Sequence, residues 1–214
     1  MPYPSKTDRQ TILSAAVKGL EHRGIRDLSL RNLAASLDLA PNAIYRYFSD
    51  RSALEDALAN EAARQLELAL RKAAGGCEPV TAVRKMSSAY IKFARDNRHL
   101  YEVMMSPHAP EHDATFLQSL WTFTVEQVQR IAGSERAAQA SVALWAFLHG
   151  AAVLEAAQVL GERKPASGLE FGLDAWLMAV STRGEPVEAL RIKPTKKTAN
   201  KKVSARERSV RSAK

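Results

Sequence analysis

Apolar side chains recur at spacings of three and four residues along this chain, and that pattern constrains its fold more than any other feature. The first such run contains Ile12, Leu13, Ala16, Val17 and Leu20. This spacing places apolar side chains on one face of an α-helix. No stretch alternates apolar and polar residues between hairpin turns, so we expect no sheet. The pattern therefore predicts an all-α fold.

Residues typical of helix ends divide the first third of the chain into four predicted helices. Gly24 closes the first helix, and Ser29 is a suitable N-cap for the second. Pro41 suits the first position of a third helix, because an N–H would have no partner there. Ser49 or Asp50 would cap a fourth, longer helix.

The periodic pattern predicts further helices beyond the two glycines that follow the fourth helix. They cover about 80–96, 98–105, 111–131, 135–160 and 168–183. From about residue 185 the apolar pattern stops, and a basic tail follows that we expect to be disordered. We therefore divide the chain into an N-terminal domain at 5–51, a helical domain at 52–184 and a basic disordered tail at 185–214.

The positive charge of the chain is concentrated at its end. From Arg191 to Lys214 there are ten Lys or Arg residues and one acid, a net charge of +9. Because the whole chain carries +8, the other 190 residues sum to −1. Overall basicity therefore does not locate a nucleic-acid site in the body of the chain.

Several classes of protein are disfavoured by the composition. The single cysteine, Cys77, excludes an internal disulfide, and no Cys/His cluster has metal-ligand spacing. The N-terminus is polar, and the most apolar stretch contains His149 and Glu155, so we interpret it as a buried helix rather than a membrane span. No nucleophile elbow or phosphate loop organises the histidines and acids. We expect a cytoplasmic protein with no catalytic residues, cofactor, metal or membrane partner.

The stretch 39–52, LAPNAIYRYFSDRS, concentrates aromatic residues around one arginine. At about 100° per residue, Ile44 and Phe48 share one face of the predicted third helix, and Tyr47 lies beside them. This face can pack on the two preceding helices.

The opposite face of the same helix carries Asn42, Tyr45 and Arg46. An amide, a phenol and a guanidinium are groups that suit base edges and phosphates. Two short helices in this arrangement after a longer one predict a helix-turn-helix. On the pattern alone, an ordinary three-helix core is the alternative.

The segment 24–58, GIRDLSLRNLAASLDLAPNAIYRYFSDRSALEDAL, resembles the DNA-binding domain of TetR-family (TetR/AcrR-type) transcriptional regulators. The glycine that closes the first helix, the Ser-Leu-Arg that opens the second, the IYRYF recognition helix and the SDRSAL start of the fourth all match. The resemblance implies base contacts from Arg31, Pro41, Asn42 and Tyr45 and phosphate contacts from Tyr45, Arg46, Tyr47 and Arg51. The Arg51 role also follows physically, because N–H groups in the first turn of a helix attract anions.

Two positions depart from the family pattern. The turn of the helix-turn-helix has Asp38 where glycine is usual, and aspartate tolerates left-handed geometry better than most residues but less well than glycine. The third helix follows Ala40, where Ser or Thr is the usual cap. This substitution should cost about 1 kcal/mol of stability at the helix end and removes one phosphate contact.

The C-terminal half is similar to a subgroup of the family named for a Trp…His-Gly motif, here Trp145, His149 and Gly150. The similarity extends to AYIKFARDNRHLYEVMMS at 89–106, in which Arg98 replaces a common proline. The resemblance implies a helical domain that dimerises and holds a small-molecule effector. For His149, a bond to a neighbouring core residue is favoured over a bond to a ligand. The candidate effector residues, each of which could instead be core, are Met104, Met105, Trp121, Phe123, Trp145 and His149.

One predicted helix in this half has a stripe of residues with two interpretations. Trp145, Leu148 and Ala152 fall close together on the helix, with small residues around Gly150 that allow another helix to approach. The stripe suits a four-helix interface between two protomers, and it suits an intrachain core equally well.

Together these features predict a sequence-specific DNA-binding transcriptional regulator. We expect a ligand-responsive repressor that binds a palindromic operator in double-stranded DNA as a homodimer. The alternatives are a sequence-neutral DNA-coating protein driven by the basic residues at 191–214 and, less favoured, an enzyme. The basic tail could instead be a solvated extension without function.

Overall fold

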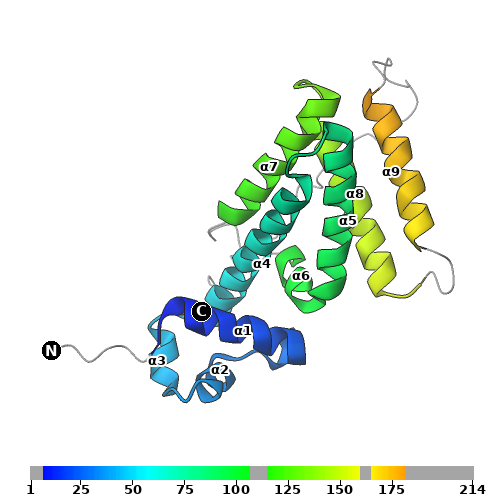
Figure 1. Cartoon of the computed structure of the whole chain (residues 1–214). Helices are drawn as coiled ribbons and strands as arrows, with labels where there is room; N and C mark the ends of the chain where they lie inside the picture. Colours follow the sequence, from blue (N-terminus) through cyan, green and yellow to red (C-terminus); the bar gives the residue numbers. More distant parts are fainter. Residues whose placement is uncertain (1–6, 107–114, 160–164, 182–214) are drawn as a thin grey trace, which may run out of the picture. The chain divides into compact units, whose positions relative to one another are not determined.

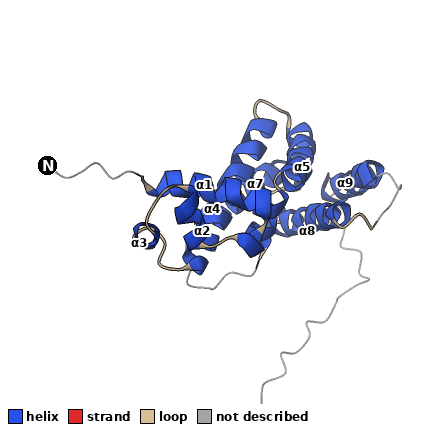
Figure 2. Cartoon of the chain, turned by 90° about the horizontal axis from the view of Figure 1, so that it is seen from below, coloured by secondary structure: helices blue, strands red, loops and turns tan. Residues whose placement is uncertain are grey.

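The protein is helical throughout the residues that its computed structural model describes, which are 7–106, 115–159 and 165–181. Figure 2 shows helices and loops and no strand among them. The helices are α1 (Arg9–Arg23), α2 (Leu30–Ser36), α3 (Pro41–Tyr45), α4 (Arg51–Ala74), α5 (Pro79–Asp96), α6 (Arg98–Met105), α7 (Thr115–Ala132), α8 (Ala137–Ala156) and α9 (Pro165–Ser181), with a short 3-10 turn at Ile25–Asp27. The predicted all-α fold is confirmed.

Most predicted helix bounds lie within a few residues of those in the structure, and α8 differs most. It ends at Ala156 rather than near 160, because Gln158 takes a positive φ of 54° that an α-helix does not contain. The predicted bounds at 111, 160 and 183 and the predicted tail at 185–214 lie outside the described residues.

Side-chain caps set the start of α2 and α4. Ser29 Oγ accepts a hydrogen bond from the N–H of Asn32 at 3.1 Å, and Asp50 Oδ1 accepts one from the N–H of Ala53 at 2.8 Å. Each cap satisfies an N–H that has no partner within its own helix. The predicted cap at Ser29 is therefore confirmed, and Asp50 rather than Ser49 caps α4.

The turn between α2 and α3 contains both departures from the family pattern. Asp38 has a φ of 53°, the left-handed geometry that glycine adopts without cost. Ala40 is the N-cap of α3 and provides no side-chain hydrogen bond to it. The two weak points that the sequence predicts are thus both present.

Replacing Ala40 with serine is expected to stabilise the protein, because serine would cap an N–H in the first turn of α3. The free energy of unfolding in urea should rise by about 0.5–1 kcal/mol. Ala35→Ser, at an exposed position within α2, is the matched control and should not raise it. An equal response of the two variants would show that the serine introduced by Ala40→Ser does not cap α3.

Helix α4 joins the N-terminal head, which we define as α1 to α3, to the remaining helices (Figure 1). Its buried face is the one that the periodicity predicts and includes Leu54, Leu58, Ala62, Leu66 and Leu70. Beyond the head, α4 packs against α5, α6 and α7. The predicted domain boundary between 51 and 52 falls in the first turn of this shared helix and stays a prediction.

Helices α8 and α9 complete the bundle. Helix α8 packs on α5 and α7, and α9 packs mainly on α8. Gly172 allows the close approach of α9, since a Cβ there would overlap the ring of Phe147. Leu148 and Ala152 are buried within the chain, so this part of the predicted stripe is intrachain core.

Candidate nucleic-acid interface and cavity

Helix α3 has the two faces that its sequence predicts. Ile44 and Phe48 are 0% and 1% exposed, whereas Tyr45 between them is 52% exposed. The helix ends at Tyr45, so Phe48, which the sequence places on this helix, lies just beyond its end. The N–H of Phe48 nevertheless bonds the Ile44 carbonyl at 3.1 Å, and this turn keeps both side chains on the buried side.

The exposed surface of α2 and α3 gathers five of the seven residues that we expect to contact DNA. These are Arg31, Pro41, Asn42, Tyr45 and Arg46. The two helices pack directly on each other. Within the described chain, the side chains of Tyr45 and Arg46 have no hydrogen-bond partner, so they are available to an external one. Their roles at bases and phosphates remain predictions.

Tyr47 lies apart from this surface. It is half-buried, and its hydroxyl donates to the Thr7 carbonyl at 2.9 Å. The guanidinium of Arg9 lies over the neighbouring Phe48 ring, 5.0 Å from its centroid. Both contacts hold the start of α1 against the end of α3. A phosphate bond from Tyr47 would require its hydroxyl to leave Thr7.

Arg51 also has a structural role that its sequence position did not indicate. Its Nη2 donates to the Ile25 carbonyl at 2.8 Å, and its Nε donates to Glu55 at 2.7 Å. The first contact ties the start of α4 to the 3-10 turn that follows α1. A guanidinium has five N–H donors, so Arg51 retains others for the predicted phosphate.

A cavity of about 40 Å³ lies among α4, α5, α7 and α8. Its walls are apolar apart from a few hydroxyl groups, and they include Leu66, Ser87, Tyr90, Trp121, Thr124 and Trp145. The rings of Trp121 and Trp145 lie side by side, with centroids 5.9 Å apart.

Two of the six predicted effector residues, Trp121 and Trp145, line this cavity. Met104 and Phe123 are buried in the core, and Met105 packs against it. His149 instead makes a hydrogen bond within the chain, in agreement with the favoured interpretation. No finding tests an effector role for these residues, and that role stays a prediction.

A chain of hydrogen bonds, which we call the tyrosine relay, leads from the cavity wall to α6 and α8. The Trp145 Nε1–H donates to the Tyr90 hydroxyl at 3.1 Å. The hydroxyls of Tyr90 and Tyr101 are 2.8 Å apart, and the Tyr101 hydroxyl is 2.7 Å from His149 Nδ1. Burial raises the pKa of both tyrosine phenols above its ordinary value, so both stay protonated at neutral pH. Sequence reasoning missed both tyrosines.

Helix α6, which carries Tyr101, is also attached to the head. Glu21 of α1 accepts a hydrogen bond from the N–H of Leu100 at 2.8 Å. This N–H belongs to the first turn of α6 and has no partner inside that helix. The cavity wall and the head are therefore linked through one short helix.

The family models match both halves of the chain. Residues 12–58 match the model of bacterial regulatory proteins of the tetR family, and residues 83–175 match that of the tetracyclin repressor-like C-terminal domain. The chain belongs to the TetR family. TetR-family proteins are DNA-binding transcriptional regulators, commonly repressors, rather than enzymes. The C-terminal match does not test the resemblance to the Trp…His-Gly subgroup, which stays a prediction.

Solved structures share the TetR fold over most of the chain. A protein of unknown function from Rhodococcus sp. RHA1 is 27% identical, with 85% of this chain and 100% of that chain covered and a TM-score of 0.73. A TetR transcriptional regulator from Streptomyces coelicolor is 21% identical over 84% and 100% of the two chains, with a TM-score of 0.70. A TetR variant from Acinetobacter baumannii in complex with minocycline is 18% identical over 81% and 96%, with a TM-score of 0.62. No curated protein matches the TetR-family chain described here.

Within residues 7–106, 115–159 and 165–181, no group of three or more His, Cys, Asp or Glu is placed to hold a metal ion.

Proposed function

We propose that the chain is a ligand-responsive repressor that acts in the cytoplasm and binds a palindromic operator as a homodimer. Membership of the TetR family supports the part of this proposal that makes the chain a DNA-binding regulator. The observation that carries the rest is an apolar surface on α8 and α9 that residues 7–106, 115–159 and 165–181 leave exposed.

Helix α8 is apolar on nearly all sides, but the described residues bury only part of its surface. Between Ala137 and Leu154 it has no Asp, Glu, Lys or Arg. By length and composition it could even cross a membrane, yet only 33% of its most apolar stretch is buried in the structure. A helix that is apolar on all sides is normally buried on all sides. We infer that another protein surface covers the rest of α8.

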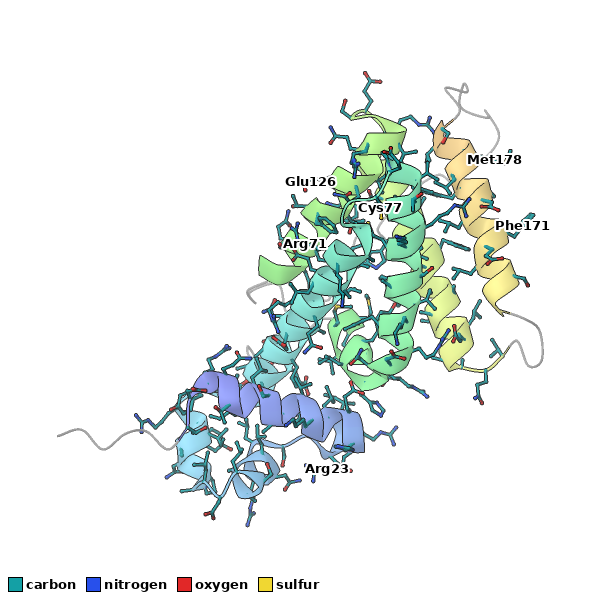
Figure 3. The ribbon with its side chains drawn as sticks, in the orientation of Figure 1. Arg23, Arg71, Cys77, Glu126, Phe171 and Met178 are labelled. Atoms are coloured by element: carbon teal, nitrogen blue, oxygen red, sulfur yellow. The ribbon has the colours of Figure 1, made fainter. Side chains whose placement is uncertain are left out.

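Helix α9 extends this apolar surface. Phe171 and Met178 are 77% and 71% exposed and lie seven residues apart, which places them on one face. Figure 3 shows both side chains pointing away from the other helices. Exposed apolar patches of this kind mark protein interfaces. We define the dimer face as Val142, Val153, Leu154, Phe171 and Met178, the large exposed apolar residues of the two helices.

A second copy of the chain is the partner that this face fits. Gly150 on α8 has open space where its Cβ would point, so another helix can approach closely there. Two copies pairing through α8 and α9 form a four-helix interface with two-fold symmetry. Such a dimer presents two α3 helices to successive major grooves, about 34 Å apart, and so reads a palindrome.

The cavity supports the response to a ligand. Tyr90 in its wall bonds Tyr101 on α6, and α6 is held to the head through Leu100 and Glu21. A ligand that disturbs the tyrosine relay would therefore change how α6 meets the head. It shifts DNA affinity only if it binds the two arrangements with different affinity. The related TetR variant from Acinetobacter baumannii was solved with minocycline, which supports a small-molecule role for the fold.

Selection of binding sites from random double-stranded DNA tests the proposed function. The expected product is an inverted repeat whose half-sites are about one helical turn apart, bound by two protomers. A set of selected fragments without any shared sequence would favour the DNA-coating alternative instead.

Deletion of residues 191–214 is expected to weaken nonspecific DNA binding and to leave sequence preference intact. The deletion removes a net charge of +9, so fewer counterions are released on binding and affinity depends less on salt. Filter binding to the selected site and to random DNA at several salt concentrations measures both effects. If the shortened chain bound no DNA at all, the head would not be the DNA-reading part.

A further inference from the structure

The polar atoms at the wall of the cavity indicate which chemical group it would recognise. The hydroxyls of Ser87, Tyr90 and Thr124 and the indole N–H groups of Trp121 and Trp145 interrupt the apolar lining, and no lining side chain is charged. An isolated charge placed in such a site would lose its hydration without gaining a partner. The cavity therefore suits an uncharged molecule.

Two of these hydroxyls donate their only proton to a carbonyl within the chain. Ser87 Oγ donates to the Val83 carbonyl at 2.9 Å, and Thr124 Oγ1 donates to the Leu120 carbonyl at 2.8 Å. A hydroxyl has one proton to donate and two lone pairs that accept. Both groups can thus offer a ligand only an acceptor.

The hydrogen bonds of the tyrosine relay leave Tyr90, too, with only an acceptor for a ligand. Its oxygen accepts from Trp145, whose N–H can only donate. If Tyr90 donates to Tyr101 and Tyr101 donates to His149 Nδ1, every proton in the relay has an acceptor. The reverse direction would leave the proton of the buried Tyr90 hydroxyl without a partner, which is unfavourable. Tyr90 therefore offers a second lone pair, and Trp145 has no remaining N–H.

We propose that the cavity selects a small, uncharged, apolar molecule that carries an O–H or N–H donor. Tyr90, Ser87 and Thr124 are the acceptors, and the paired rings of Trp121 and Trp145 form apolar wall. The volume of about 40 Å³ is far below the ~300–1,000 Å³ of drug-sized sites, so a single-ring ligand suits it best. This inference rests on the proposed ligand response and defines the chemistry of the ligand.

Three one-ring probes test the proposal on the full-length protein by titration calorimetry. Phenol carries the donor, anisole has the same ring and oxygen without a donor, and benzoate is charged. Wild type should bind phenol more tightly than anisole and should bind benzoate at least tenfold more weakly than phenol. Benzoate binding as tight as that of phenol, or no binding of phenol at millimolar concentration, would overturn the proposal.

The ratio of phenol to anisole affinity identifies the acceptors. Tyr90→Phe should lower it by about three- to tenfold, which is the value of one hydrogen bond. Thr124→Val and Ser87→Ala remove the other acceptors without touching the tyrosine relay, and they decide the question if Tyr90→Phe does not fold. Ser88→Ala, on the exposed neighbour of Ser87, is the matched control and should leave the ratio unchanged. A ratio that stays the same in every folded variant contradicts recognition of a donor.

Adding phenol to the complex with the selected operator separates this inference from the proposed function. If phenol binds as expected but does not weaken DNA binding, the ligand class stands and ligand-responsive repression is wrong. If DNA binding is specific but phenol does not bind, only the ligand class is wrong.

Discussion

Replacement of Phe171 by glutamate is expected to convert the dimer into monomers and to reduce operator binding at least a hundredfold. Two-fold symmetry places this substitution twice in the interface, and each copy would bury an unpaired carboxylate. Truncation of a large side chain at the centre of an interface already costs about 2 kcal/mol or more. Analytical ultracentrifugation would measure the mass and filter binding the operator affinity.

Leu68→Glu is the matched control for this prediction. Leu68 lies on α4 and is 54% exposed, but it is not part of the dimer face. Its replacement introduces the same charge at an exposed apolar site and should leave the mass unchanged. A Phe171→Glu protein that remained a dimer at micromolar concentration would show that α9 does not form the interface.

Replacing Tyr45 or Arg31 with alanine is expected to weaken binding to the selected operator by about 1–3 kcal/mol each, which is roughly 5- to 150-fold. Both side chains are exposed on the surface shared by α2 and α3. Because both have a proposed contact to bases, with a phosphate contact in addition for Tyr45, binding to random DNA should change less than binding to the operator. Filter binding to the operator and to random DNA, at several salt concentrations, measures the two losses and the salt slope.

Arg46→Ala serves as the contrast, because we assign Arg46 to a phosphate. Its loss should weaken binding to both kinds of DNA alike and lower the salt slope by about one. If the Tyr45 and Arg31 variants behaved in the same way as Arg46→Ala, they would not be base contacts.

The sequence was most informative where local rules apply. Ser29 and Asp50 mark helix starts because a capping side chain acts on N–H groups only a few residues away. Pro41 marks another because an N–H at the first helical position would have no partner. The periodicity divided α3 correctly, with Ile44 and Phe48 buried and Tyr45 exposed, because side-chain direction in a helical turn depends only on position.

Contacts between distant residues could not be predicted in this way. Glu21 and Leu100 are 79 residues apart, and no local pattern relates an acid on α1 to an amide on α6. The hydroxyl of Tyr47 likewise meets Thr7 across 40 residues. Tyr47 was predicted to lie beside the packing face and, by resemblance, to bind phosphate, but no local pattern indicated that its hydroxyl holds the start of α1.

By itself, the sequence determined the helices, the helix-turn-helix, the exposed face of α3 and the family, because each depends on neighbours along the chain or on a motif of about 50 residues. Only the tertiary structure decided what the C-terminal residues do. It placed Leu148 in the core, left Phe171 exposed and joined Tyr90, Tyr101 and His149 into one relay. In a helix that is apolar on every side, composition does not distinguish the faces, and only the packing of neighbouring helices decides which face remains for a partner.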